Sequence, residues 1–151
     1  MTDSEPPSPR RIILAGILAV AAAGVAGGLV SFRAATAPET ESFRFSRDSA
    51  FAAGEAARLK GFLAPAVQDD RLSVIIVGHS GLQGESAARL ALSEKRAASA
   101  QGIALEMGIP PERVSATGVG RDAPLPRKAG QSEDAHEAML ARVEVTLQMR
   151  R

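Results

Sequence analysis

The sequence predicts a small α/β domain of two layers, a sheet covered by helices, behind an uncharged N-terminal segment. An unbroken run of β-branched residues at 74–77 ends at Gly78, which is typical of a central strand covered on both faces. An Ala-rich stretch of helical spacing follows it, and alternating apolar residues mark a last strand at 143–147. Strand, helix, strand, helix, strand and a long connection to a final strand make an α/β two-layer sandwich, βαβαβ plus one strand.

Composition limits the classes of function. The chain has 151 residues, a formal net charge of +1, no Cys, no Trp or Tyr, and five Phe. Once an N-terminal segment is set aside, this length leaves room for one small domain. The near-neutral charge, without a basic stripe or aromatic platforms, argues against nucleic acid as a partner. With no Cys and only two His, the chain lacks the ligands of a common metal site, so we expect no metal and no cofactor.

The N-terminal part predicts membrane attachment. Residues 1–11 form a polar, Pro-rich tail, and residues 12–30 carry no charge. A helix of residues 12–30 would be about 28 Å long, close to the hydrocarbon thickness of a bilayer, so we expect an uncleaved transmembrane helix. The alternative is a signal peptide, because Ala35-Thr-Ala37 has the small-x-small pattern, although Pro38 directly after it disfavours cleavage there.

Flanking charges suggest the orientation of this segment. Arg33, Arg44 and Arg47 follow it within about 17 residues, so a count of charges alone does not decide. Arg10 and Arg11 adjoin it directly after a very short tail, which favours a single-pass inner-membrane protein with a cytoplasmic N-terminus. Signal cleavage would instead release the domain to the periplasm or the outer membrane. Residues 12–30 are rich in Ala and Gly and include a GxxxG pattern, which offers a face for self-association. Residues 31–42, small and polar, are expected to be a linker to a domain at 43–148.

The first half of the domain predicts a strand and a helix. Residues 43–45 alternate as in a half-buried strand. A helix is expected from a cap at Asp48 or Ser49 to about Leu63, ended by Pro65. The C-terminal part is predicted to form, in order, a strand at 114–118, a loop at 121–132, a short helix at 133–140 and a strand at 143–147.

The second long helix predicts an anion site. Ser93 is the expected N-cap of a helix at 94–107, and Arg96 follows it by three residues. A cation is unfavourable in the first turn, because the unpaired N–H groups and the positive end of the helix dipole lie there. An anion that joined them would remove this cost, so the helix terminus and Arg96 together predict a carboxylate site.

The motifs around this helix resemble a known family. The spacing Gly78-His-Ser-Gly, Gly84, Leu92-Ser93-Glu-Lys-Arg96-Ala97 is similar to the core motif of the OmpA C-terminal-like domain, which is also found in Pal and MotB. The resemblance covers about residues 42–148, through flanking matches at Phe43-Arg-Phe45-Ser46, Gly118-Val-Gly120-Arg-Asp-Ala-Pro124 and Arg142-Val-Glu-Val145. It implies a non-enzymatic periplasmic domain of a Gram-negative cell envelope that binds the diaminopimelate peptides of peptidoglycan non-covalently.

The resemblance also implies the ligand-binding residues. These are Ser80, Gly81, Gly84, Glu85, Leu92, Ser93 and Arg96. Family members that bind diaminopimelate have Asp where this chain has Gly81, Asn where it has Arg89, and Asn-Arg where it has Leu140-Ala141. In the resembled site Arg takes the carboxylate of a zwitterion and Asp takes its ammonium.

The missing Asp is expected to weaken binding. Losing that interaction predicts a cost of about tenfold to a hundredfold in affinity. Glu85, four residues after Gly81, is a candidate replacement. We therefore expect Arg96→Ala to abolish binding to diaminopimelate peptides and Gly81→Asp to strengthen it about tenfold.

Two further functions are compatible with the sequence. The first is an interaction or scaffold subunit of an envelope complex that has kept the fold and lost the ligand site, which Gly81 and Arg89 favour. The second and more remote is an envelope hydrolase, suggested by His79-Ser80. The stretch from Gly78 to Leu82 lacks the second Gly of GxSxG, however, and no triad Asp follows in a known order.

Overall fold

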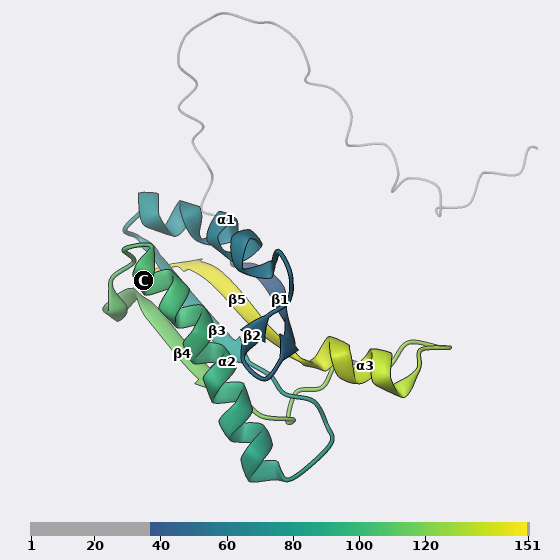
Figure 1. Ribbon diagram of the computed structural model, residues 1–151. Coiled ribbons are helices and arrows are strands. Elements are labelled where there is room, and N and C mark those ends of the chain that lie inside the picture. Colours follow the sequence, from purple (N-terminus) through teal and green to yellow (C-terminus); the bar gives the residue numbers. More distant parts are fainter. Residues whose placement is uncertain (1–36, 151) are drawn as a thin grey trace, which may run out of the picture. The chain divides into compact units, whose positions relative to one another are not determined.

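The structure, a computed structural model, describes residues 37–150 (Figure 1). The expected tail 1–11 and transmembrane helix 12–30 lie outside the described residues, as do residues 31–36 of the expected linker. Within residues 37–150 no helix is long and apolar enough to cross a membrane.

The described residues form one mixed sheet. Its strands lie in the order β2-β1-β5-β3-β4, and every pair is antiparallel except β3 with β4. The elements in chain order are β1 (Glu39–Arg47), β2 (Ala50–Phe51), α1 (Glu55–Gln68), β3 (Leu72–Gly78), α2 (Ser86–Glu106), the 3-10 helix η1 (Pro111–Arg113), β4 (Val114–Gly118), α3 (Glu133–Leu140) and β5 (Arg142–Met149). The predicted order of main elements is therefore confirmed, and β2 is an addition.

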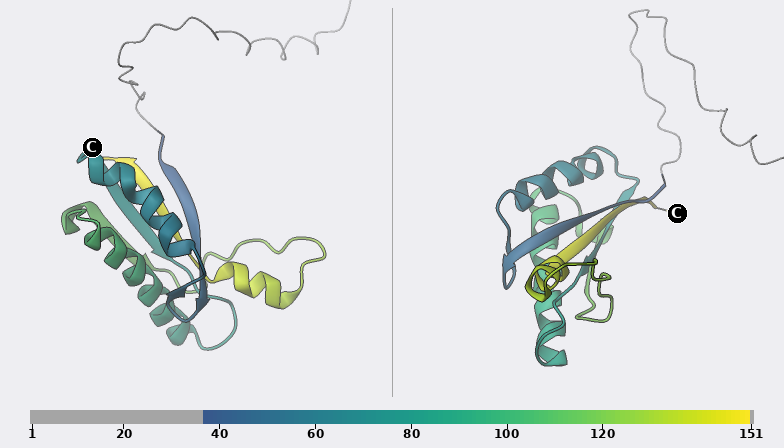
Figure 2. Two further views of the ribbon diagram at one scale, coloured as in Figure 1. Left: turned by 45° about the horizontal axis from the view of Figure 1, so that its top comes forward. Right: turned by 90° about the vertical axis from the view of Figure 1, so that its right-hand side faces the viewer.

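The helices α1 and α2 lie side by side over one face of this sheet, while α3 extends beyond its end (Figures 1 and 2). The core between the layers is apolar, and its strand residues alternate. Along β3, Val74 and Ile76 are buried whereas Ile75 and Val77 are half-buried. The prediction that this strand is covered on both faces was wrong, because the domain has a helical layer on one face only.

The first strand and helix differ from the predicted boundaries. β1 begins at Glu39, where it pairs with Leu147 of β5, so the strand includes residues 39–42 of the expected linker. The helix α1 does not begin at Asp48 or Ser49, because β2 pairs with β1 at that point.

Pro65 lies inside α1 rather than at its end, and the helix continues to Gln68. Arg113 stabilises this last stretch. Its buried guanidinium donates to the carbonyl oxygens of Ala66 in the last turn, of Asp69 at the C-cap and of Leu72 at the start of β3, and so links the end of α1 to the next strand.

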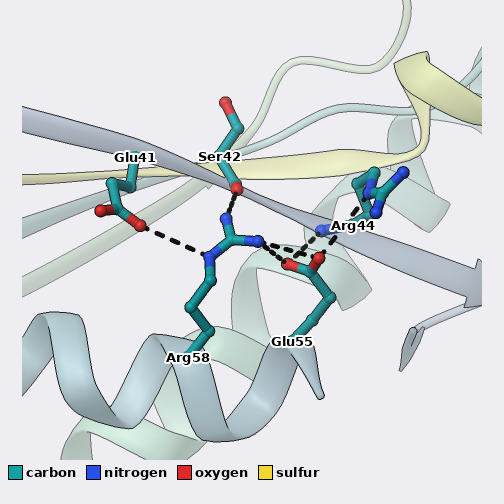
Figure 3. Close-up of polar contacts among 5 residues, drawn as sticks. All are labelled: Glu41, Ser42, Arg44, Glu55 and Arg58. Carbon is teal, nitrogen blue, oxygen red and sulfur yellow. Dashed lines mark hydrogen bonds and ion pairs between the residues drawn. The ribbon is translucent and has the colours of Figure 1, made fainter. Parts of the chain in front are cut away.

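A polar network attaches the start of α1 to β1 (Figure 3). Glu55 is buried, with its carboxylate 2.8 Å from Arg58 Nη1 and accepting from the Arg44 backbone N at 3.3 Å. Arg58 also donates to the Ser42 carbonyl and lies 3.5 Å from a carboxylate oxygen of Glu41. Opposite charges therefore neutralise the buried carboxylate and fix the helix on the strand.

Candidate functional site

The helix α2 approaches the sheet most closely at Ser93. A Cβ at Gly78 would overlap the Ser93 carbonyl oxygen, and a Cβ at Gly118 would lie 2.5 Å from Ser93 Oγ. Ser93 is 0% exposed, and its Oγ donates to the Leu90 carbonyl at 2.7 Å while accepting from Gly120 N at 2.8 Å. The two glycines, which are neighbours on β3 and β4, thus make room for a helix that is hydrogen-bonded to the loop beyond the sheet.

Ser93 is therefore not the N-cap of a helix. The helix begins at Ser86 with Glu85 at its N-cap position, and Ser93 lies in its interior. Residues 86–92 are mostly Ala and Leu, which favour helix, so the helix extends back from the predicted start. Arg96 is remote from the helix terminus, and the predicted cooperation between that terminus and Arg96 is wrong.

Arg96 instead reaches from α2 to two loops. Its side chain is buried, with Nε donating to the Asp48 carbonyl at 2.6 Å and Nη1 to the His79 carbonyl at 2.9 Å. The guanidinium carbon lies 5.3 Å from the centre of the Phe45 ring, within the range of a cation–π contact. Burial, and secondly the charge of Arg89, lower the pKa of Arg96, but a guanidinium stays protonated at neutral pH.

No carboxylate within residues 37–150 lies within ion-pair distance of Arg96. Its acceptors are neutral carbonyl groups, and no group in that part of the chain accepts from Nη2. A buried cation held only by neutral acceptors gains strongly from an anion. Arg96 is thus the best-placed group for a carboxylate ligand, for a reason other than the predicted one.

A carboxylate from α3 lies on the loop between β3 and α2, residues 79–85. Glu137 accepts from the backbone N of Leu82 at 2.9 Å and of Gln83 at 3.4 Å. A Cβ at Gly81 would overlap its Oε1 and lie 2.9 Å from its Oε2. The φ of Gly81 is not positive, so space for Glu137, and not backbone conformation, accounts for glycine here.

The other predicted site residues lie around the same loop. Ser80 is buried, and its Oγ donates to the Gly81 carbonyl at 3.2 Å. Gly84 has a positive φ of 98° and packs beside the guanidinium of Arg89. Leu92 is half-buried on α2, whereas Glu85 is exposed and forms no ion pair within residues 37–150.

Ser80, Gly81 and Gly84 thus lie on the loop whose first residue, His79, accepts from Arg96, and the structure does not show Glu85 as the replacement carboxylate. Sequence reasoning missed Glu137 because 55 residues separate it from Leu82, and no local spacing links the two. The signal was the absent side chain at position 81, which left room for a group from elsewhere.

His79 and Ser80 are not arranged as base and nucleophile. Ser80 Oγ donates to a carbonyl, and the nearest partner of the buried His79 ring is Glu144, at 3.6 Å from Nε2. Burial, followed by the charge of Arg142, lowers the pKa of His79, while Glu144 opposes the shift. In the described part of the chain, no three acidic or His side chains gather in a way that could hold a metal ion.

Comparison with solved structures finds this fold in OmpA-like domains. The peptidoglycan-associated lipoprotein of Burkholderia pseudomallei is 22% identical, with a TM-score of 0.61 over 71% of this chain and 89% of that chain. A putative MotB-like protein of Desulfovibrio vulgaris is 24% identical, with a TM-score of 0.60 over 75% and 76% of the two chains. The OmpA-like domain of FopA1 from Francisella tularensis is 20% identical, with a TM-score of 0.61 over 76% and 77%. A comparison with curated protein sequences found no match.

The class defined by this sheet and its helices is the mixed α/β fold of OmpA-like domains. The family profile described as the OmpA family matches residues 45–138, more than half of the chain. The chain belongs to the OmpA family, as the motifs around Gly78 and Arg96 predicted.

Proposed function

We propose that this protein binds diaminopimelate peptides of peptidoglycan non-covalently through Arg96 and anchors them to the inner membrane through residues 12–30. Domain 43–148 would then lie in the periplasm. The observation that carries the proposal is the buried guanidinium of Arg96, which neutral carbonyls hold beside an exposed loop. A ligand carboxylate would give this cation the charged partner that it lacks within residues 37–150. The likeness to a peptidoglycan-associated lipoprotein supports the proposal.

Binding to purified sacculi tests this function. The fragment 38–151 contains the whole sheet and its core, so it is suitable for a pull-down. We expect the wild-type fragment to sediment with sacculi and Arg96→Ala to lose this ability. Arg121→Ala is the matched control, because Arg121 is an exposed arginine on the loop after β4.

Arg96 also has a structural role, so folding must be checked separately. Thermal unfolding would show whether Arg96→Ala is folded at the assay temperature. Arg96→Lys keeps the positive charge and loses the planar array of donors, so we expect weakened but measurable binding from it. Equal sedimentation of wild type and both Arg96 variants would refute the assignment of Arg96.

A second function is favoured by one observation. The two hydrogen bonds and the aromatic contact of Arg96 are enough to explain the residue without any ligand. The protein would then be an interaction or scaffold subunit of an envelope complex with an inactive ligand site. Failure of the folded wild-type fragment to sediment with sacculi would support this function over the first.

A further inference from the structure

We propose that Glu137 is the residue of this chain that binds the ammonium group of the zwitterionic ligand, a role that position 81 cannot fill. The inference rests on the proposed function, because it concerns the second charge of the same ligand. It assigns the specificity of the site to α3, an element outside the loop and helix that carry the family's motif.

At position 81, a side chain from α3 takes the place of the side chain that glycine lacks. The Glu137 carboxylate occupies the place where any side chain at position 81 would begin, and its Oε2 is 2.9 Å from that point. An acid from α3 therefore takes up the space that an acid on the loop would use. Glycine at position 81 and glutamate at position 137 form one arrangement, since neither alone would place a carboxylate there.

The Glu137 carboxylate is held by neutral backbone groups. The two amides that bind Glu137 belong to Leu82 and Gln83 and are neutral, and the carboxylate has no ion pair within residues 37–150. Two hydrogen bonds use about half of the acceptor sites of a carboxylate. The remaining sites are available to an ammonium group, which would add a charge-assisted hydrogen bond.

Arg96 and Glu137, which carry opposite charges, bind the same loop. Arg96 binds the carbonyl at the start of the loop, at His79, and Glu137 binds the amides three and four residues further on. Burial lowers the pKa of Arg96, and the charge of Glu137 is among those that oppose this shift. A zwitterion that carries ammonium and carboxylate on one carbon has a partner for each of these two charges, whereas a simple anion uses only one of them.

Three synthetic stem peptides separate the two charges of the ligand. One contains diaminopimelate, the second contains 2-aminopimelate, which lacks the distal amine, and the third contains lysine, which lacks the distal carboxylate. Titration calorimetry would use the full-length protein in detergent. We expect wild type to bind the diaminopimelate peptide about tenfold or more tightly than either of the others.

The variant Glu137→Gln keeps an oxygen that can accept from the Leu82 amide and removes the charge. We expect it to bind the diaminopimelate peptide about tenfold or more weakly and the 2-aminopimelate peptide as wild type does. Asp134→Asn is the matched control, since Asp134 is an exposed acid in the first turn of α3. It should bind all three peptides as wild type does.

Restoring an acid on the loop provides a second test. Gly81→Asp alone should not strengthen binding, because its side chain can enter only by displacing the flexible Glu137 carboxylate, which exchanges one acid for another. This replaces the expectation drawn from the sequence. In Gly81→Asp with Glu137→Ala the space is vacated, and we expect the preference for diaminopimelate over 2-aminopimelate to return.

The outcomes distinguish the inference from the function on which it rests. If Arg96→Ala abolishes binding and folded Glu137→Gln still prefers diaminopimelate as wild type does, the role of Glu137 is overturned and the function stands. If wild type binds none of the peptides, both are overturned. Improved binding by Gly81→Asp alone would also contradict the inference, because it would show that Glu137 does not already supply the negative charge.

Discussion

Replacing Gly78 with Ala tests how closely α2 lies on the sheet. The new Cβ would overlap the Ser93 carbonyl oxygen and lie 3.0 Å from the Ala97 backbone N. Both are backbone atoms of a long helix, so no side-chain rotation can relieve the contact and α2 must shift. Overpacking lowers the free energy of unfolding by about 1–3 kcal/mol. Because the atoms that the new Cβ meets are backbone atoms, we expect a loss at the upper end of this range, about 3 kcal/mol.

Gly102→Ala is the matched control for this substitution. Gly102 lies within α2, and a Cβ there meets no atom within 4 Å. Alanine has a higher helix propensity than glycine, so we expect the free energy of unfolding to rise by about 0.5–1 kcal/mol. The two substitutions, which add the same methyl group, should change the free energy of unfolding in opposite directions.

Urea unfolding of fragment 38–151, followed by far-UV circular dichroism, would measure both effects. A loss of about 3 kcal/mol corresponds to a fall of roughly 10 °C in Tm for a domain of this size. Since α2 carries Arg96, its shift should also weaken peptide binding. A Gly78→Ala variant as stable as wild type would refute the close approach of α2 to β3.

Two further predictions concern pH and membrane attachment. Because burial lowers the pKa of His79, the unfolded chain binds a proton that the folded domain does not. The free energy of unfolding should therefore fall as the pH falls below about 6.5, and His79→Gln should reduce this dependence in urea titrations between pH 7.5 and 5. A pH dependence unchanged in His79→Gln would contradict this account. If residues 12–30 are an uncleaved anchor, the protein should fractionate at full length with the inner membrane. Recovery of a soluble periplasmic species beginning near Pro38 would show signal cleavage instead.

The secondary-structure elements that depend on local periodicity could be predicted from the sequence. The β-branched run at 74–77, the short helix at 133–140 and the alternation at 143–147 all correspond to observed elements. The start of α2 was misplaced because Ser93 is of a residue type that favours the N-cap, while the residues before it favour helix.

The site could be predicted only in part. Arg96 was found through its motif, but the partners that hold it, at Asp48 and His79, come from distant parts of the chain. Glu137 was missed for the same reason. Tertiary contacts across tens of residues leave no local pattern, so a candidate cation could be named from the sequence and the carboxylate beside the loop could not.

The two hydrogen bonds from Arg96 to carbonyl oxygens affect how relatives of this protein can diverge. The guanidinium links α2 to the β1–β2 turn and to the loop after β3, and it covers the ring of Phe45. A descendant that no longer needed a ligand would still lose stability if this arginine changed. Loss of the ligand alone would therefore leave the arginine in place. In an unfamiliar sequence, an arginine at this position indicates first that α2 is linked to the turn and the loop, and binding is a separate property to be measured.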